Sequence, residues 1–247
     1  MSELRAPAKL TWFLEITGRR DDGVHLLRSE MVTLDLADRL TVDESGDDLV
    51  VSGLSEGVPL DETNLVRRAL ALVQRRAGVT LVKSIPTGGG LGGGSADAAA
   101  ILRWAGGVSV EQAFTLGSDV PFCQLGGRAL VEGVGELLTP LDYERREVTL
   151  FMPDFGVNTA ACYEAFDELV ANGWSASGQN HLEVPATFVE PRVARTLMYL
   201  RDQFGPRVHL AGSGSTLFCE GHVGTESSGL LGPDGPIGVL HSITMPA

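Results

Sequence analysis

The first third of the chain alternates apolar and polar positions in several short runs, and a period of two is typical of β-strands. The runs cover residues 7–17, 29–37, 40–43 and 49–52, with Asp and Gly residues between them. Short alternating runs broken by turn-forming residues predict an antiparallel meander. A further strand is expected over residues 79–85, which are rich in β-branched side chains.

A different spacing begins after residue 61. Apolar side chains then recur at intervals of three and four, which predicts a helix with Thr63 or Asn64 as its N-cap. Further helices are expected over residues 96–104, 109–116, 159–171 and 189–204. Further strands are expected over residues 128–131, 147–152, 207–211, 216–220 and 238–244, with a loop over residues 221–236.

The predicted strands and helices do not follow a regular βαβ order. This mixture favours an α+β fold over a doubly wound parallel sheet. The composition of the chain also changes over residues 140–146. We therefore expect two domains, residues 1–146 and residues 147–247.

The strongest chemical signal is a glycine-rich loop over residues 86–95. Six of the seven residues from Gly88 to Gly94 are glycine, and each would cost about 1 kcal/mol relative to alanine inside a helix. Such density indicates a backbone that passes close to a ligand or adopts positive φ angles repeatedly. The loop joins a predicted strand to an alanine-rich helix, so its N–H groups and the helix N-terminus converge, which predicts an anion site. A flexible linker is the alternative, but the flanking elements leave no polar spacer for one.

The loop does not match several common nucleotide-binding motifs. Residues 88–93 fit the GxGxxG pattern, which is a weak match in so glycine-rich a run. A dinucleotide site also requires an acidic residue at the end of a second strand about 20 residues later, and residues 109–116 are predicted to be helical. No GK[ST] sequence closes the loop, and the chain has no HRD or DFG sequence. These features argue against dinucleotide, Walker A and protein kinase sites.

The net charge of the chain is −13, so its average field repels nucleic acid and anionic membrane surfaces. A phosphorylated small molecule can still bind where N–H groups and a lysine act locally. The three scattered cysteines indicate reduced thiols in a cytoplasmic protein. No apolar run reaches the roughly 18 residues of a membrane span, and the chain starts without an apolar leader. We expect a monomer or weak homodimer with a small-molecule substrate.

Residues 86–100 resemble the central motif of the GHMP small-molecule kinases, which include galactose, homoserine and mevalonate kinases. Other segments, from about residue 6 to residue 220, resemble one branch of that family. This branch phosphorylates a cytidine diphosphate polyol in the non-mevalonate route to isoprenoid precursors. The segments are Ala6-Pro-Ala-Lys9-Leu, Arg19-Arg20-x-Asp22-Gly23-x-His25, Asn64-Leu65, Leu116-Gly-Ser-Asp119-Val-Pro-Phe122, Glu132-Gly-Val-Gly-Glu136 and Leu210-Ala-Gly-Ser-Gly214.

This resemblance implies a ribosomal-protein-S5-like N-terminal domain and a ferredoxin-like C-terminal α/β sandwich. It implies ATP and Mg²⁺ as cofactors, Lys9 and Asp119 as catalytic residues, and Ser95 as a metal ligand. In the branch, the His25 position reads cytosine and an aromatic ring at the Tyr163 position stacks on it. The implied ATP-binding positions are Asn64, Pro86, Gly88, Gly89, Gly90, Leu91, Gly92, Gly93, Gly94, Ser95 and Ala96. The implied substrate-binding positions are Thr11, Val24, His25, Tyr163, Gly212, Ser213 and Gly214.

Three residues depart from the pattern of the branch: Val24 replaces tyrosine, Thr11 replaces asparagine and His181 replaces aspartate. The stretch from residue 97 to residue 119 is also shorter than is typical. Because a stacked aromatic contributes roughly 1–3 kcal/mol per base, Val24 weakens or alters cytidine recognition. Three alternatives stay open: a GHMP kinase for a different alcohol, a nucleotide-binding relative without catalysis, and a dinucleotide-dependent oxidoreductase.

Overall fold

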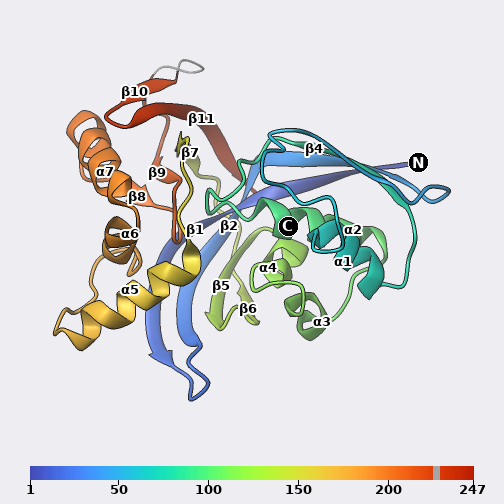
Figure 1. The fold of residues 1–247 in the computed structure, drawn as a ribbon, viewed down its shortest axis with the longest axis horizontal. Helices are drawn as coiled ribbons and strands as arrows, with labels where there is room; N and C mark the ends of the chain where they lie inside the picture. Colours follow the sequence, from blue (N-terminus) through green and yellow to red (C-terminus); the bar gives the residue numbers. More distant parts are fainter. Residues whose placement is uncertain (225–228) are drawn as a thin grey trace.

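The computed structural model describes residues 1–224 and 229–247, which form an α+β fold as the sequence predicts. Eleven strands of these residues make one sheet, whose main path runs β3-β4-β2-β11-β7-β9-β8. Figure 1 shows the sheet running through both halves of the molecule. The strands are β1 (Ser2–Arg19), β2 (His25–Asp43), β3 (Leu49–Gly53), β4 (Gly78–Lys83), β5 (Arg128–Gly133), β6 (Leu137–Pro140), β7 (Glu147–Pro153), β8 (His209–Leu210), β9 (Leu217–Glu220), β10 (Leu230–Gly232) and β11 (Gly235–Met245).

The helices of the described residues lie in two groups (Figure 1). The first group, α1–α4, lies beside the N-terminal strands, and the second, α5–α7, lies at the other end beside β8 and β9. The helices are α1 (Leu65–Leu72), α2 (Gly93–Trp104), α3 (Val110–Phe114), α4 (Val120–Leu125), α5 (Thr159–Ala171), α6 (Glu183–Val189) and α7 (Pro191–Phe204). In the part of the chain that the structure describes, none of them is long and apolar enough to span a membrane.

β1 and β2 form one long antiparallel hairpin that pairs from Ser2↔Val42 to Arg19↔His25. The two runs predicted within residues 29–43 are therefore parts of a single strand, because pairing with β1 carries the chain through the polar residues between them. The register of β1 shifts immediately before Lys9 and again after Thr11. Such irregularities re-aim neighbouring side chains, and both of these polar side chains are buried.

Three predictions of local structure are wrong. β3 does not belong to an antiparallel meander: it pairs in parallel with β4, because the crossover through α1 returns the chain in the same direction. The helix predicted over residues 189–204 begins at Pro191, since a residue before proline avoids helical angles and Glu190 has φ −134° and ψ 95°. The loop predicted over residues 221–236 contains β10 and the start of β11, and its residues 225–228 lie outside the described residues.

Buried apolar side chains of the described residues form three clusters. One lies between α1–α4 and the N-terminal strands, and a second lies under α5–α7. The third contains residues of both halves, including Leu10 of β1, Ile85 at the start of the glycine-rich loop and Phe218 of β9. The loop is therefore anchored to both halves of the chain, and the domain boundary over residues 140–146 stays a prediction.

Asn180 ties the segment before α6 to the turn after β8. Its side chain is buried, and Nδ2 donates hydrogen bonds to the carbonyl oxygens of Leu210 (2.8 Å) and Gly212 (2.7 Å). Oδ1 accepts a hydrogen bond from the N–H of Leu182 (2.9 Å). One amide side chain thus holds the turn that presents Gly212 and Ser213 to the rest of the molecule.

We expect Asn180→Ala to lower the free energy of unfolding by about 1–3 kcal/mol for each buried polar group that it deprives of a partner. Urea unfolding followed by circular dichroism measures this. Asn172→Ala is the matched control, because Asn172 is exposed and donates locally to the carbonyl oxygen of Glu168. Surface substitutions of this kind change stability by about 0.5 kcal/mol or less. Equal losses in the two variants would contradict the role given to Asn180.

Candidate active site

A cleft of about 470 Å³ lies between the glycine-rich loop and the second half of the chain. Its walls come from β1, the β3–α1 loop, the glycine-rich loop, the residues before α4, α5 and the turn after β8. Both predicted catalytic residues, Lys9 and Asp119, line this cleft. The other predicted positions that line it are Thr11, Asn64, Pro86, Gly88, Gly89, Gly90, Leu91, Gly92, Gly93, Gly94, Ser95, Tyr163, Gly212 and Ser213. Val24, His25, Ala96 and Gly214 are not among its lining residues.

Lys9 and Asp119 form an ion pair inside the cleft. The distance between Lys9 Nζ and Asp119 Oδ2 is 3.2 Å, and Lys9 Nζ also donates to the hydroxyl of Thr11 at 3.1 Å. Asp119 precedes α4, but its side chain makes no capping hydrogen bond to that helix. Its carboxylate therefore faces the lysine. The Lys9 side chain is 7% exposed and the Asp119 side chain 29%, so a substrate can reach the aspartate.

The backbone of the glycine-rich loop packs closely against protein on both sides. Gly88, Gly90 and Gly92 have φ between 67° and 77°, which favours glycine. A Cβ on Gly90 would lie 2.7 Å from the carbonyl oxygen of Ala211, and one on Gly92 would lie 2.7 Å from Lys9 Cγ. Part of the glycine density is therefore required by contacts within the protein itself, in addition to any approach of the loop to a ligand.

Two backbone hydrogen bonds hold the loop in place. The N–H of Lys9 donates to the carbonyl oxygen of Leu91 at 3.0 Å, and the N–H of Thr216 donates to that of Gly89 at 3.2 Å. The loop thus bridges β1 and the turn after β8. Since Lys9 also carries one member of the ion pair, the position of the loop and the position of the ammonium group are linked.

The loop leads directly into the N-terminus of α2. Gly92 is the N-cap in the left-handed conformation and supplies no side-chain cap. The first N–H groups of a helix have no intrahelical acceptor, and here those of Gly93, Gly94 and Ser95 belong to residues that line the cleft. Gly94 is exposed and Ser95 is half-buried. This arrangement can hold an anion through N–H groups and the positive end of the helix dipole.

Sequence reasoning missed a buried charged cluster under the loop, formed by Asp38, Lys83 and Asp97. Lys83 Nζ donates to Asp97 Oδ2 at 2.7 Å and also to Asp38. Burial, with a smaller effect from the nearby Asp38 carboxylate, raises the pKa of Asp97 to about 7 against the attraction of Lys83. A signal was present in the strand pattern, since Lys83 occupies the same inward face of β4 as Val79 and Leu81.

The opposite end of the site contains an aromatic pair. The rings of His25 and Tyr163 stack with centroids 4.9 Å apart, and His25 Nε2 lies 2.7 Å from Asp167 Oδ1. Tyr163 lines the cleft, and burial, with a smaller effect from the Asp119 carboxylate, raises its pKa to about 12. Val24 is 45% exposed. Sequence reasoning also missed Asp167, which comes from α5 and approaches the hairpin tip only in the folded chain.

The turn after β8 completes the wall beside Lys9. The hydroxyls of Ser213 and Thr159 lie 2.8 Å apart, which joins the turn to the start of α5. A Cβ on Gly212 would lie 3.6 Å from Thr11 Oγ1 and 4.0 Å from Lys9 Nζ. The predicted cleft residues from β1 and from the turn are therefore neighbours, although some 200 residues separate them in the sequence.

The sequence model of the GHMP kinases N terminal domain matches residues 64–127. The crystal structure of L. major mevalonate kinase in complex with R-mevalonate resembles this chain with a TM-score of 0.67 at 10% identity, over 100% of this chain and 97% of that chain. At this identity the likeness concerns the fold alone.

Relatives of higher identity are more specific. A 4-diphosphocytidyl-2-C-methyl-D-erythritol kinase of Paracoccus denitrificans is 38% identical over 231 residues, which cover 86% of this chain and 84% of that protein. A kinase of the same name from Methylibium petroleiphilum is 36% identical over 249 residues, 90% of this chain and 85% of that protein. A crystal structure of 4-(cytidine 5'-diphospho)-2C-methyl-D-erythritol kinase matches with a TM-score of 0.72 at 31% identity, over 100% of both chains.

Fold, cleft and domain match together define a small-molecule kinase with the GHMP architecture. Within that class, the chain belongs to the 4-diphosphocytidyl-2-C-methyl-D-erythritol kinase family. The resemblance seen in its motifs is thereby confirmed.

We expect Gly94→Val to weaken ATP binding by at least tenfold in calorimetry, because its side chain would fill the cleft at the start of α2. Gly94 suits this test because its φ is not positive and the nearest atom to an added Cβ is Leu65 Cδ1 at 3.4 Å. A valine at Gly92 would instead displace Lys9. Gly117→Ala, outside the cleft lining, is the control and should leave ATP affinity unchanged. Normal affinity in Gly94→Val would rule out the loop as the phosphate site.

Proposed function

We propose that this chain transfers the γ-phosphoryl group of ATP to a hydroxyl of 4-diphosphocytidyl-2-C-methyl-D-erythritol, in the non-mevalonate route to isoprenoid precursors. The observation that carries the proposal is the Lys9–Asp119 ion pair in the same cleft as the uncapped N-terminus of α2. Membership of the kinase family supplies the substrate class. A coupled assay of ATP consumption with this cytidyl substrate tests it.

Phosphoryl transfer requires alignment of the reacting groups and stabilisation of charge on the transferred group. The N–H groups at the start of α2 donate to the oxygens of the triphosphate and fix its orientation. Because the loop is hydrogen-bonded to β1 beside Lys9, the same contacts set the distance between the phosphate and the ion pair. The glycine-rich loop acts in this way as the positioning device for ATP.

Asp119 accepts the proton of the attacking hydroxyl or orients that hydroxyl toward the phosphorus atom. Lys9 pairs with Asp119 and stabilises negative charge that develops on the attacking oxygen. At the observed 3.2 Å and an effective dielectric constant near 20, two unit charges interact by about 5 kcal/mol before the exposure of Asp119 is taken into account. Thr11 accepts a hydrogen bond from the ammonium group and holds it beside the cleft.

The residues of the cleft fit Mg²⁺ as a companion of ATP. Kinases hold Mg²⁺ through few protein groups together with the phosphates, and no larger metal-binding group of His, Cys, Asp or Glu occurs among the described residues. Ser95, half-buried at the start of α2, lines the cleft and is the proposed protein ligand. When bound, the ion would neutralise part of the charge of the phosphates.

For the cytidyl end of the substrate we propose Tyr163 as the stacking surface and His25 as the group that reads the base. The turn containing Gly212, Ser213 and Gly214 supports the polyol. In the present structure the His25 ring lies on the Tyr163 ring. Stacking of a base on that face of Tyr163 therefore requires the imidazole to move aside, away from its Asp167 partner.

The remaining proposals concern the domain organisation, cellular location and partners of the enzyme. We propose two domains, residues 1–146 and 147–247, with ATP bound largely by the first. The protein acts in the cytoplasm as a monomer or weak homodimer and binds no nucleic acid. The exposed Val24 supports a second candidate, a GHMP kinase for another alcohol, because the ring expected at this position is missing.

We expect Asp119→Asn to lower kcat by about 10²–10⁴, the usual effect of losing a proton-transfer group, with little change in ATP affinity. If Lys9 and Asp119 act as one unit, adding Lys9→Ala to Asp119→Asn should cost far less than the product of the two single effects. Steady-state kinetics of the two single variants and the double variant measure this. Fully multiplicative losses would show that the residues serve separate steps.

If cytidine is the recognised group, Val24→Tyr should lower the KM of the cytidyl substrate by up to about tenfold, since about 1.4 kcal/mol of stacking corresponds to that factor. Tyr163→Ala should raise the same KM, and the KM of ATP should stay constant in both variants. Turnover of a different alcohol, together with no activity on the cytidyl substrate, would favour the second candidate.

A further inference from the structure

Asp38, Lys83 and Asp97 join the two ends of the glycine-rich loop. Lys83 is the last residue of β4, where the loop begins, and Asp97 lies in α2, just after the loop ends. The ammonium group of Lys83 donates to Asp97 at 2.7 Å and also to Asp38 of β2. One buried cation therefore connects the strand before the loop, the helix after it and the neighbouring long strand.

The cluster also holds the backbone that leads into the loop. Asp38 Oδ1 accepts hydrogen bonds from the N–H groups of Ser84 and Ile85, the latter at 2.9 Å. A Cβ on Gly93 would lie only 3.1 Å from Lys83 Nζ. The residues just before the loop are thus bound to Asp38, and the first residue of α2 lies against Lys83.

The charges of the cluster argue against a direct role in phosphate binding. Two carboxylates face one ammonium group, so the cluster presents no net positive charge to a triphosphate. Asp38 is 0% exposed, Asp97 3% and Lys83 4%, and Lys83 is already bound to both carboxylates. Buried ion pairs are poor devices for raising stability, which favours a role in geometry.

We propose that Asp97 is a positioning residue, which acts through Lys83 to fix the start of α2 relative to β4 so that the loop N–H groups converge on the triphosphate of ATP. The inference rests on the proposed ATP-dependent function and gives Asp97, which lines the cleft and is paired with Lys83, a role through that lysine. Small displacements matter here, because a shift of about 1 Å at a reacting centre can cost a factor of about 10² in rate.

The test compares two substitutions of Asp97. Asp97→Asn keeps an oxygen that accepts the Lys83 hydrogen bond, and we expect the KM of ATP and kcat to stay within about threefold of the wild type. Asp97→Ala removes the acceptor, and we expect the KM of ATP to rise at least tenfold and kcat to fall by about 10–100-fold. The KM of the alcohol substrate should change less than twofold, because that substrate binds at the other end of the cleft.

Glu30→Gln is the matched control. Glu30 lies in β2 like Asp38, is 8% exposed and accepts hydrogen bonds from Arg128 Nε and Arg146 Nη1 at 2.8 Å. None of these three residues lines the cleft. We expect this variant to lower the Tm without changing the KM of ATP. All assays are run well below each Tm.

Three results would overturn the inference: wild-type KM and kcat in Asp97→Ala, equal changes in Asp97→Asn and Asp97→Ala, or an equal rise of the KM of ATP in Glu30→Gln. The second result would indicate an effect of charge, and the third an effect of general destabilisation. Calorimetry of ATP binding distinguishes failure of this inference from failure of the proposed function. If the wild type fails to bind ATP, the function is wrong, whereas equal ATP binding by the wild type and Asp97→Ala contradicts only the role of Asp97.

Discussion

The close packing of the glycine-rich loop between β1 and the turn after β8 is the constraint on which the rest of the site depends. The loop is hydrogen-bonded to Lys9 on one side and to Thr216 on the other. A side chain at Gly90 would collide with the carbonyl oxygen of Ala211, and one at Gly92 with Lys9. Because both halves of the chain contribute to this contact, the proposed phosphate site and the ion pair are held by the same set of contacts.

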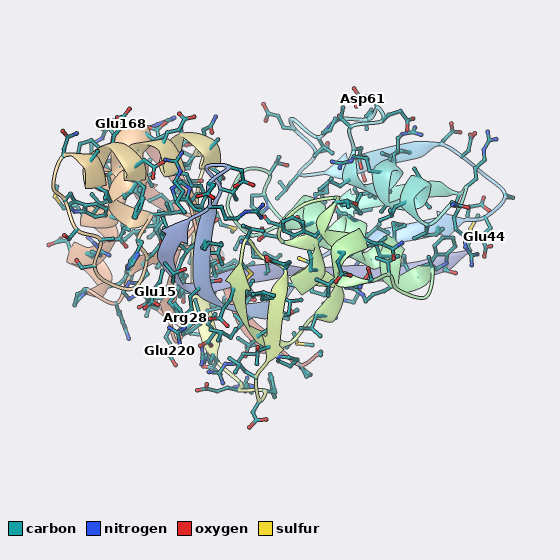
Figure 2. All side chains as sticks on the ribbon, turned by 90° about the horizontal axis from the view of Figure 1, so that it is seen from below. Glu15, Arg28, Glu44, Asp61, Glu168 and Glu220 are labelled. Atoms are coloured by element: carbon teal, nitrogen blue, oxygen red, sulfur yellow. The ribbon has the colours of Figure 1, made fainter. Side chains whose placement is uncertain are left out.

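An acidic protein that uses ATP must bind an anionic ligand against its own negative net charge. The chain carries a net charge of −13, and its acidic side chains are spread over the surface, as the labelled Glu44, Asp61, Glu168 and Glu220 illustrate (Figure 2). Attraction of ATP must therefore be local. In the proposed ATP site, the N–H groups at the start of α2 and the buried Lys9 act at short range, where solvent screening is weakest.

Much of this arrangement could be predicted from the sequence, because its signals are local. Glycine spacing and the Asn64 cap identify the loop and α1, and the motif around Lys9 and Asp119 identifies the ion pair that the structure brings together. The parallel pairing of β3 and the Asp38–Lys83–Asp97 cluster could not be predicted in this way, since they depend on which strands become neighbours. The contact of Asp167 with His25 likewise links residues 142 positions apart.

The place of β11 in the sheet has a consequence for how the protein is made. This strand lies between β2 and β7, yet it follows every other helix and strand in the sequence. Only Thr244 and Met245 of β11 pair with β2, whereas residues 237–243 pair with β7. During synthesis on the ribosome one edge of β7 therefore stays unpaired until β11 has emerged. Exposed strand edges are sites of aggregation. The growing chain is therefore prone to aggregate until β11 pairs with β7.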